Sequence, residues 1–120
     1  MSKTSARSYR DLILWQRAIE TCTAVYRFTQ NFPREEVYGL ASQIRRASVS
    51  VPSNVAEGYG RLSREQYRHF LGIASGSNLE LQTQLVIARE LGYGDPEEAH
   101  RIEEMSFEVG RMLTTMLKKL

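Results

Sequence analysis

Apolar residues recur at alternating steps of three and four along four stretches of this 120-residue chain. That spacing puts the apolar side chains on one stripe of an α-helix, and such a stripe must be buried against another element. The four stretches are 12–29, 37–54, 67–88 and 102–116. Because no segment alternates with period two over a useful length, we expect helices and no β-sheet.

Local signals separate the first two helices. Pro33 follows the first stretch, and the residue before a proline avoids helical angles. The second stretch contains Pro52, which cannot donate to the carbonyl of Ser48 and is expected to kink or divide the helix. Gly58 and Gly60 then mark the turn to the third helix.

The last two helices have clear boundary signals. Ser63 and Gln66 stand in capping-box spacing at the start of the third helix, and Gly92 supplies its C-terminal stop. Asp95 and Pro96 begin the fourth helix as its N-cap and first-turn proline.

All three connections between these helices are short, so neighbouring helices must run antiparallel. The sequence therefore predicts an all-α chain, folded as an antiparallel up-down-up-down four-helix bundle over residues 9–120. Residues 1–8 are predicted to form a disordered N-terminal tail.

Two helices carry more apolar residues than one buried stripe requires. In the first helix the predicted stripe is Leu12, Trp15, Ile19, Cys22, Tyr26 and Thr29. The additional apolar residues are Leu14, Val25 and Phe28 on the first helix, and Phe70, Ile73, Leu79, Val86 and Ile87 on the third. Exposed apolar patches usually mark interfaces, so we expect self-association; the alternative is that the stripes are wide because each helix packs on two neighbours. Small residues from Gly72 to Ser77 also favour the close approach of another helix.

Composition is that of a soluble globular domain, with 42% hydrophobic and 25% charged residues. No apolar run approaches the roughly 20 residues that a membrane span needs, and the polar N-terminus has no secretory apolar region. Cys22 is the only cysteine, which excludes an intramolecular disulfide. We therefore expect a cytoplasmic protein that does not bind a membrane.

The sequence offers little for catalysis. His69 and His100 are far apart, and neither stands in a metal-ligand spacing. The Gly58-Tyr59-Gly60 segment lacks the strand and the lysine of a phosphate-binding loop. We expect no enzyme activity, no metal site and no cofactor.

Residues 1–70 carry a formal charge of +5 and residues 71–120 carry −3. Around the second turn, Arg61, Arg64 and Arg68 are predicted to gather at one end of the bundle, with Arg45 and Arg46 further along its length. Arginine suits bidentate contacts to phosphate better than lysine does. The candidate phosphate-binding residues are Arg45, Arg46, Arg61, Arg64 and Arg68, with Tyr59 or Tyr67 available for stacking on bases. The alternative is a solvated helix face, with Arg45 or Arg46 paired to Glu57 or to a carboxylate of a neighbouring subunit.

Four motifs carry a family resemblance: Trp15-Gln16-Arg17-Ala18, Gln43-Ile44-Arg45-Arg46-Ala47, Ser50-Val51-Pro52-Ser53-Asn54-Val55-Ala56-Glu57-Gly58 and Phe70-Leu71-Gly72-Ile73-Ala74-Ser75-Gly76-Ser77. With them, the chain resembles the four-helix-bundle proteins encoded in intervening sequences of bacterial 23S rRNA genes, once labelled S23 ribosomal proteins. The resemblance covers the chain from about residue 9 to residue 120 and assigns a structural or interface role to Ser50, Asn54, Glu57 and Gly58.

The resemblance implies assembly into a ring of five copies. A related branch, the accessory variability determinant of diversity-generating retroelements, is a basic, barrel-like pentamer that binds nucleic acid and a reverse transcriptase. By analogy, a reverse transcriptase is a candidate partner here, although this chain is less basic than that branch. The predicted function is non-enzymatic binding of structured RNA, another nucleic acid or a ribonucleoprotein through the five arginines. The alternative is a scaffold ring whose arginines make inter-subunit ion pairs without binding nucleic acid.

Overall fold

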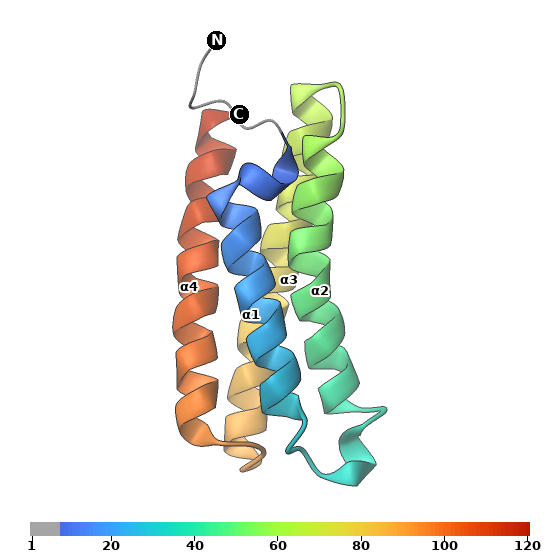
Figure 1. Cartoon of the computed structure of the whole chain (residues 1–120), viewed down its shortest axis with the longest axis vertical. Helices are drawn as coiled ribbons and strands as arrows, with labels where there is room; N and C mark the ends of the chain where they lie inside the picture. The colour runs from blue at the N-terminus through green and yellow to red at the C-terminus, as the bar shows by residue number, and fades with distance from the viewer. Residues whose placement is uncertain (1–7) are drawn as a thin grey trace.

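The computed structural model describes residues 8–120 and confirms the predicted all-α, antiparallel four-helix bundle (Figure 1). The long helices are α1 (Ile13–Thr29), α2 (Leu40–Tyr59), α3 (Arg64–Glu90) and α4 (Pro96–Lys119). Two short 3₁₀ helices, η1 (Tyr9–Asp11) and η2 (Arg34–Glu36), precede α1 and α2. The bundle measures 50 × 23 × 20 Å, and none of its described helices is long and apolar enough to cross a membrane.

The up-down topology sorts the connections between the two ends of the bundle. At one end lie η1, the α2–α3 turn and the C-terminus of α4; at the other lie the α1–α2 and α3–α4 connections (Figure 1). Each helix packs against two neighbours, so α1 and α3 occupy opposite corners. Of the predicted tail, residues 1–7 lie outside the described residues, whereas the Ser8 hydroxyl accepts a hydrogen bond from the backbone N–H of Arg10 and caps η1.

The predicted helix boundaries of α3 and α4 are confirmed. The Ser63 hydroxyl accepts a hydrogen bond of 3.0 Å from the backbone N–H of Gln66. At the other end of α3, Gly92 adopts a positive φ of 74°, a conformation that glycine adopts without steric cost. The Asp95 carboxylate caps α4 by accepting a hydrogen bond from the backbone N–H of Glu97.

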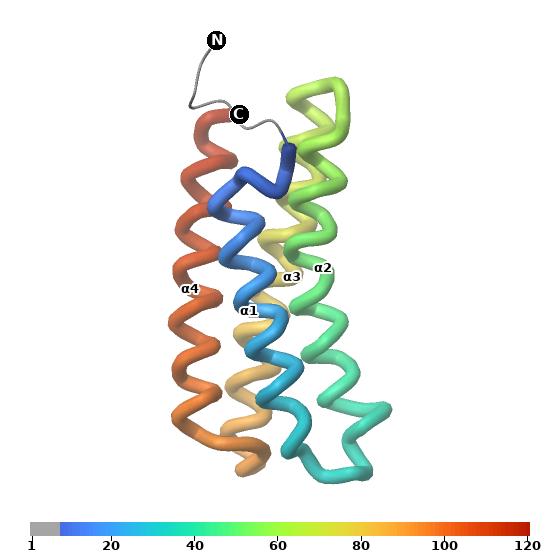
Figure 2. Tube along the Cα trace, in the orientation of Figure 1, coloured from blue at the N-terminus to red at the C-terminus, as the bar shows by residue number. Residues whose placement is uncertain are grey.

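The division of the second helix at Pro52 and the start of its buried stripe at Val37 are not found. Pro52 lies inside α2, which runs as one continuous helix (Figure 2). Pro52 is buried, and burial of its ring offsets the missing hydrogen bond to the Ser48 carbonyl. Val37 was expected to begin the buried stripe, but it lies outside α2 in the turn after η2 and is 51% exposed.

The core consists of two layers along the bundle axis. The layer nearer the chain termini contains Leu14, Ala18, Val51, Val55, Leu71, Ala74, Val109 and Leu113. The layer nearer the opposite end contains Val25, Phe28, Ile44, Ala47, Leu81, Leu85, Ala88, Ala99 and Ile102. On α3 the buried residues follow the predicted stripe, from Leu71 to Ala88.

The stripe predicted for α1 is mostly wrong. The residues that α1 buries are Leu14, Ala18, Thr21, Val25, Phe28 and Thr29. Leu14, Val25 and Phe28, which were predicted to form a second apolar face, are therefore core residues, whereas Tyr26 is 41% exposed and Cys22 is only half-buried. Both stripes have helical spacing, and the position of α1 between α2 and α4 selects the one that is buried.

Candidate nucleic-acid interface

The five candidate arginines form two separate groups. Arg45 and Arg46 lie in the first turns of α2, near the end that holds the α1–α2 connection. Arg61 lies in the α2–α3 turn, and Arg64 and Arg68 lie in the first turns of α3. Because an α-helix rises 1.5 Å per residue, about 20 Å of helix separates Arg46 from the end of α2. The structure therefore does not bring all five residues into one patch.

Arg45 is held by its own chain. Its Nε donates a hydrogen bond of 2.7 Å to the Thr29 hydroxyl, and its Nη2 donates one of 3.3 Å to the Tyr26 carbonyl. Its guanidinium carbon also lies 4.6 Å from the centroid of the Tyr26 ring, a cation–π distance. These contacts join α2 to the C-terminal turn of α1, so Arg45 has a structural role.

Arg46 is exposed and faces a polar groove between α2 and α3. The groove is lined by Gln43, Arg46, Ala47, Ser50, Ser77 and Glu80. The hydroxyls of Ser50 and Ser77 lie 2.8 Å apart and bridge the two helices. Within residues 8–120, the Arg46 guanidinium has neither a hydrogen bond nor an ion pair.

Of the four family-motif residues, Ser50 and Gly58 lie at the contact between α2 and α3. The Asn54 amide donates hydrogen bonds to the carbonyl and the hydroxyl of Ser50, at 2.8 and 3.0 Å. A Cβ on Gly58 would lie 2.9 Å from the Cβ of Phe70, so only glycine allows this close helix approach. The fourth residue, Glu57, makes an ion pair with Arg61.

Arg61 and Arg68 have partners in their own chain but remain exposed at the turn. Besides its ion pair with Glu57, Arg61 lies 4.8 Å over the Phe70 ring. Arg68 Nη1 donates a hydrogen bond of 2.7 Å to the Leu117 carbonyl near the C-terminus of α4. Arg64 is exposed and makes no hydrogen bond or ion pair within the described part of the chain.

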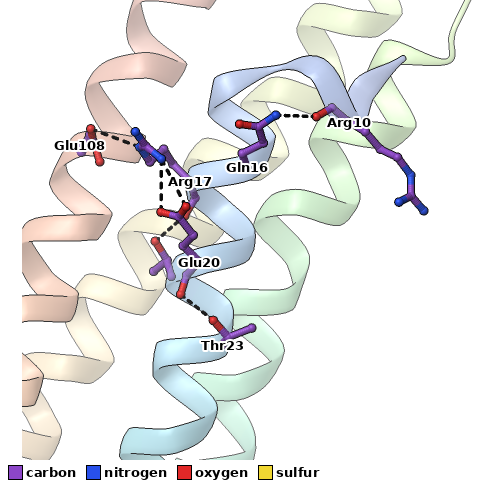
Figure 3. Close-up of polar contacts among 7 residues, drawn as sticks. Arg10, Gln16, Arg17, Glu20, Thr23 and Glu108 are labelled. Carbon is purple, nitrogen blue, oxygen red and sulfur yellow. Dashed lines mark hydrogen bonds and ion pairs between the residues drawn. The ribbon is translucent and has the colours of Figure 1, made fainter. Parts of the chain in front are cut away.

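Sequence reasoning missed three cations that lie at the same end. Lys118 and Lys119 occupy the last turn of α4, and both are exposed without an ion-pair partner among the described residues. Arg10 belongs to η1, which the Gln16 amide ties to α1 by a 2.8 Å hydrogen bond to the Arg10 carbonyl (Figure 3). The predicted topology could have placed these three cations, because in an up-down bundle of four helices both chain termini lie at the same end as the second turn.

We name this region the basic end and define it by Arg10, Arg61, Arg64, Arg68, Lys118 and Lys119. The same region holds three carboxylates, those of Asp11, Glu57 and Glu65, so its formal charge is +3. The opposite end, residues 27–40 and 87–103, carries four cations and seven carboxylates, a formal charge of −3. The charge asymmetry therefore runs along the bundle axis.

Away from the two ends, the charges of α1 are paired. Arg17 lies 3.3 Å from the Glu20 carboxylate and 3.7 Å from that of Glu108, and the second ion pair ties α1 to α4 (Figure 3).

The two histidines lie near opposite ends, His69 near the start of α3 and His100 near the start of α4. No group of three or more potential metal ligands is found among residues 8–120.

Comparisons with known proteins agree with the fold. None of the curated proteins matches the chain. A crystal structure of a protein with unknown function from the S23 ribosomal protein family of Bacteroides thetaiotaomicron superposes with a TM-score of 0.80 and 22% sequence identity, covering 88% of this chain and 99% of that one. The family model described as 23S rRNA-intervening sequence protein matches residues 10–115, and the chain therefore belongs to that family.

Proposed function

We propose that this protein is a non-enzymatic, homo-oligomeric, cytoplasmic protein that binds structured RNA, free or in a ribonucleoprotein, through the basic end of its bundle. The observation that supports the proposal is the gathering of six cations from η1, the α2–α3 turn and the last turn of α4 at one end of the rod. Arg64, Lys118 and Lys119 have no partner among the described residues, so they are free to neutralise phosphates. The family description also names 23S rRNA as its genetic context.

The proposed site differs from the five arginines that the sequence singles out. Arg61, Arg64 and Arg68 remain in it, and the lysines of α4 and Arg10 join it. Arg45 and Arg46 are left out because they lie near the other end of α2.

Support for self-association comes from the outward face of α3. Leu79 is 59% exposed, and Ile73, Val86 and Ile87 are exposed as well. A Cβ on Gly72 or on Gly76 would meet no atom of this chain within 4 Å, which leaves room for a second copy.

A ring of five copies, which the family resemblance implies, would also strengthen RNA binding. In a cyclic ring whose protomers stand with their bundle axes along the symmetry axis, every basic end would lie on the same face. The summed positive field on that face would attract an anionic partner more strongly than a single protomer would.

Charge reversal at matched cations tests the proposal. In one variant, Arg64→Glu, Lys118→Glu and Lys119→Glu are combined; in the control, Arg27→Glu, Arg34→Glu and Arg101→Glu make the same change in net charge at the opposite end, also at exposed cations. Binding of a labelled structured RNA is measured across a salt series, with circular dichroism to check folding.

We expect the basic-end variant to weaken binding at least about 30-fold at low salt and to reduce the slope of log K against log salt by about 0.9 for each phosphate that it no longer neutralises. The control should change affinity by less than about threefold, through long-range charge alone. Equal losses of affinity in the two variants would show that only net charge matters and would refute a site at the basic end.

A second candidate, the scaffold ring, is favoured by one observation. Arg46 and Glu80 line the same groove, and no ion pair joins them. Opposite charges left unpaired on one surface are suited to pairing with a second copy. In that case Arg46→Glu would dissociate the oligomer, as measured by its mass in solution, and the RNA would bind to neither the parent protein nor the variant.

A further inference from the structure

The aromatic rings at the basic end are engaged within the chain. Tyr9 packs edge-on against Trp15, with ring centroids 5.2 Å apart. The guanidinium of Arg10 lies over both rings, 5.7 and 5.9 Å from their centroids. This arrangement covers the rings with a cation and fixes that cation on the surface.

The aromatic rings at the α2–α3 turn are engaged within the chain as well. Tyr59 and Tyr67, which the sequence offered for base stacking, are half-buried and pack edge-to-face with centroids 6.1 Å apart. Burial raises the pKa of the Tyr67 hydroxyl, and the neighbouring Tyr59 raises it further. Phe70 lies beneath Arg61 and beside His69, at 4.8 and 5.2 Å.

Proteins that hold single-stranded nucleic acid stack successive bases on open aromatic faces. At the basic end Tyr9, Trp15 and Phe70 instead lie under cations, and Tyr59 and Tyr67 pack against each other. Leu62, at the tip of the α2–α3 turn between Arg61 and Arg64, is fully exposed but is aliphatic. The chemistry of this end therefore matches phosphates rather than unstacked bases.

Several cations of the basic end are also held in fixed positions. Arg61 is fixed by Glu57 and Phe70, and Arg68 by the Leu117 carbonyl. The bundle is only 23 × 20 Å in cross-section, so these cations form a compact array. A duplex carries two phosphates for each one that a single strand presents over the same rise per nucleotide, so a compact array of cations has more phosphates within reach on a duplex.

We infer that the RNA class bound by the basic end is base-paired RNA, recognised through the phosphates of both strands. The inference rests on the proposed function. Recognition of this kind reads the shape of the A-form helix and little of its sequence.

The test compares a single strand of about 20 nucleotides, without internal pairing, with the duplex that it forms with its complement; this length exceeds the roughly 16 base pairs that a domain specific for duplex RNA spans. Binding is measured by fluorescence anisotropy across a salt series. Trp15 is the only tryptophan and lies at the basic end, so its emission reports stacking at this site. We expect the duplex to bind about tenfold more tightly at low salt, with a salt slope of about 0.9 per neutralised phosphate against about 0.7 for a single strand. Trp15 emission should change little.

The outcomes separate the inference from the proposed function. A single strand that binds as tightly as the duplex, with quenching of Trp15, overturns the inference and leaves RNA binding at the basic end standing. Failure of both RNAs to bind at low salt overturns the proposed function and, with it, the inference.

Discussion

The two ends of this bundle use similar residue types in different ways. At the opposite end, Phe32 packs against Phe28 and Tyr93, with ring centroids 5.1 and 5.5 Å away. Tyr93 donates a hydrogen bond of 3.0 Å to the Glu36 carboxylate, whose other oxygen accepts one of 2.9 Å from the backbone N–H of Leu40. These interactions join both connections at this end to the core.

At the basic end, cations extend into solvent. The side chains of Arg64, Lys118 and Lys119 make no hydrogen bond or ion pair within residues 8–120. Arg27, Arg34 and Arg101 at the opposite end are exposed as well, so what distinguishes the basic end is its excess of cations over carboxylates. Three predictions follow from this difference and are given from the largest expected effect to the smallest.

Substitution of two glycines in the α3–α4 connection tests how tightly the opposite end is packed. Both have positive φ, 74° at Gly92 and 73° at Gly94. A Cβ on Gly94 would lie 2.5 Å from Cε1 of the fully buried Phe28, whereas one on Gly92 would meet nothing within 4 Å. We expect Gly94→Ala to lower the free energy of unfolding by about 3 kcal/mol, from backbone strain and overpacking. Gly92→Ala should cost only about 1 kcal/mol, from strain alone.

Urea denaturation of the two variants checks this prediction. Equal decreases in stability would mean that Phe28 moves aside easily and that the opposite end is less rigid than its packing indicates.

A second set of variants compares partnered and free arginines. Arg45→Gln should lower the free energy of unfolding by about 1.5 kcal/mol, because it removes the hydrogen bonds to Thr29 and Tyr26 and the cation–π interaction. Arg64→Gln and the neighbouring control Arg46→Gln should each change stability by less than about 0.5 kcal/mol, as surface substitutions do. Thermal unfolding measures all three. A destabilisation by Arg64→Gln as large as that by Arg45→Gln would contradict the distinction between partnered and free arginines.

The smallest expected effect concerns stability at alkaline pH. The hydrogen bond to Glu36 is the main cause that raises the pKa of the Tyr93 hydroxyl above its usual 10.0. At pH values just above 10, the folded state therefore keeps the proton of the Tyr93 hydroxyl, whereas the unfolded state loses it. The resulting stabilisation is complete below pH 10 and is lost progressively as pH rises from there through the raised pKa.

Tyr93→Phe should flatten the decline of stability with pH above 10, measured by urea denaturation at several pH values. Tyr67 serves as the comparison at the basic end, since burial is the main cause of its raised pKa. Glu36→Ala removes the acceptor and should therefore reduce the contribution of Tyr93 and leave that of Tyr67. If Glu36→Ala leaves the alkaline decline unchanged, the hydrogen bond is not its source.

The boundaries of α3 and α4 could be read from the sequence because they depend on neighbouring residues. Ser63 caps α3 through a residue three positions away, and Asp95 caps α4 through one two positions away. The α3 stripe was predicted correctly as well, and the additional apolar residues Ile73, Leu79, Val86 and Ile87 are exposed. Pro52 was misjudged because local rules count the hydrogen bond that it removes but not the burial of its ring.

The candidate site could be predicted only in part. The arginines of the α2–α3 turn were found because they are close in sequence. Lys118 and Lys119 were missed because they lie far along the chain and join that turn only through the antiparallel packing of α4. The role of Arg45 was equally hidden, since its partners Thr29 and Tyr26 are on another helix.

The sequence by itself determined four helices, their direction and most of their ends, because helical periodicity, capping and short connections act over a few residues. The tertiary structure decided which stripe of α1 is buried, which cations are used inside the fold, and which of them gather at the basic end. Each of those outcomes depends on packing between helices that are distant in sequence. The two stripes of α1 have the same spacing, and Arg45 and Arg46 are the same residue type, so only the neighbouring helices distinguish them.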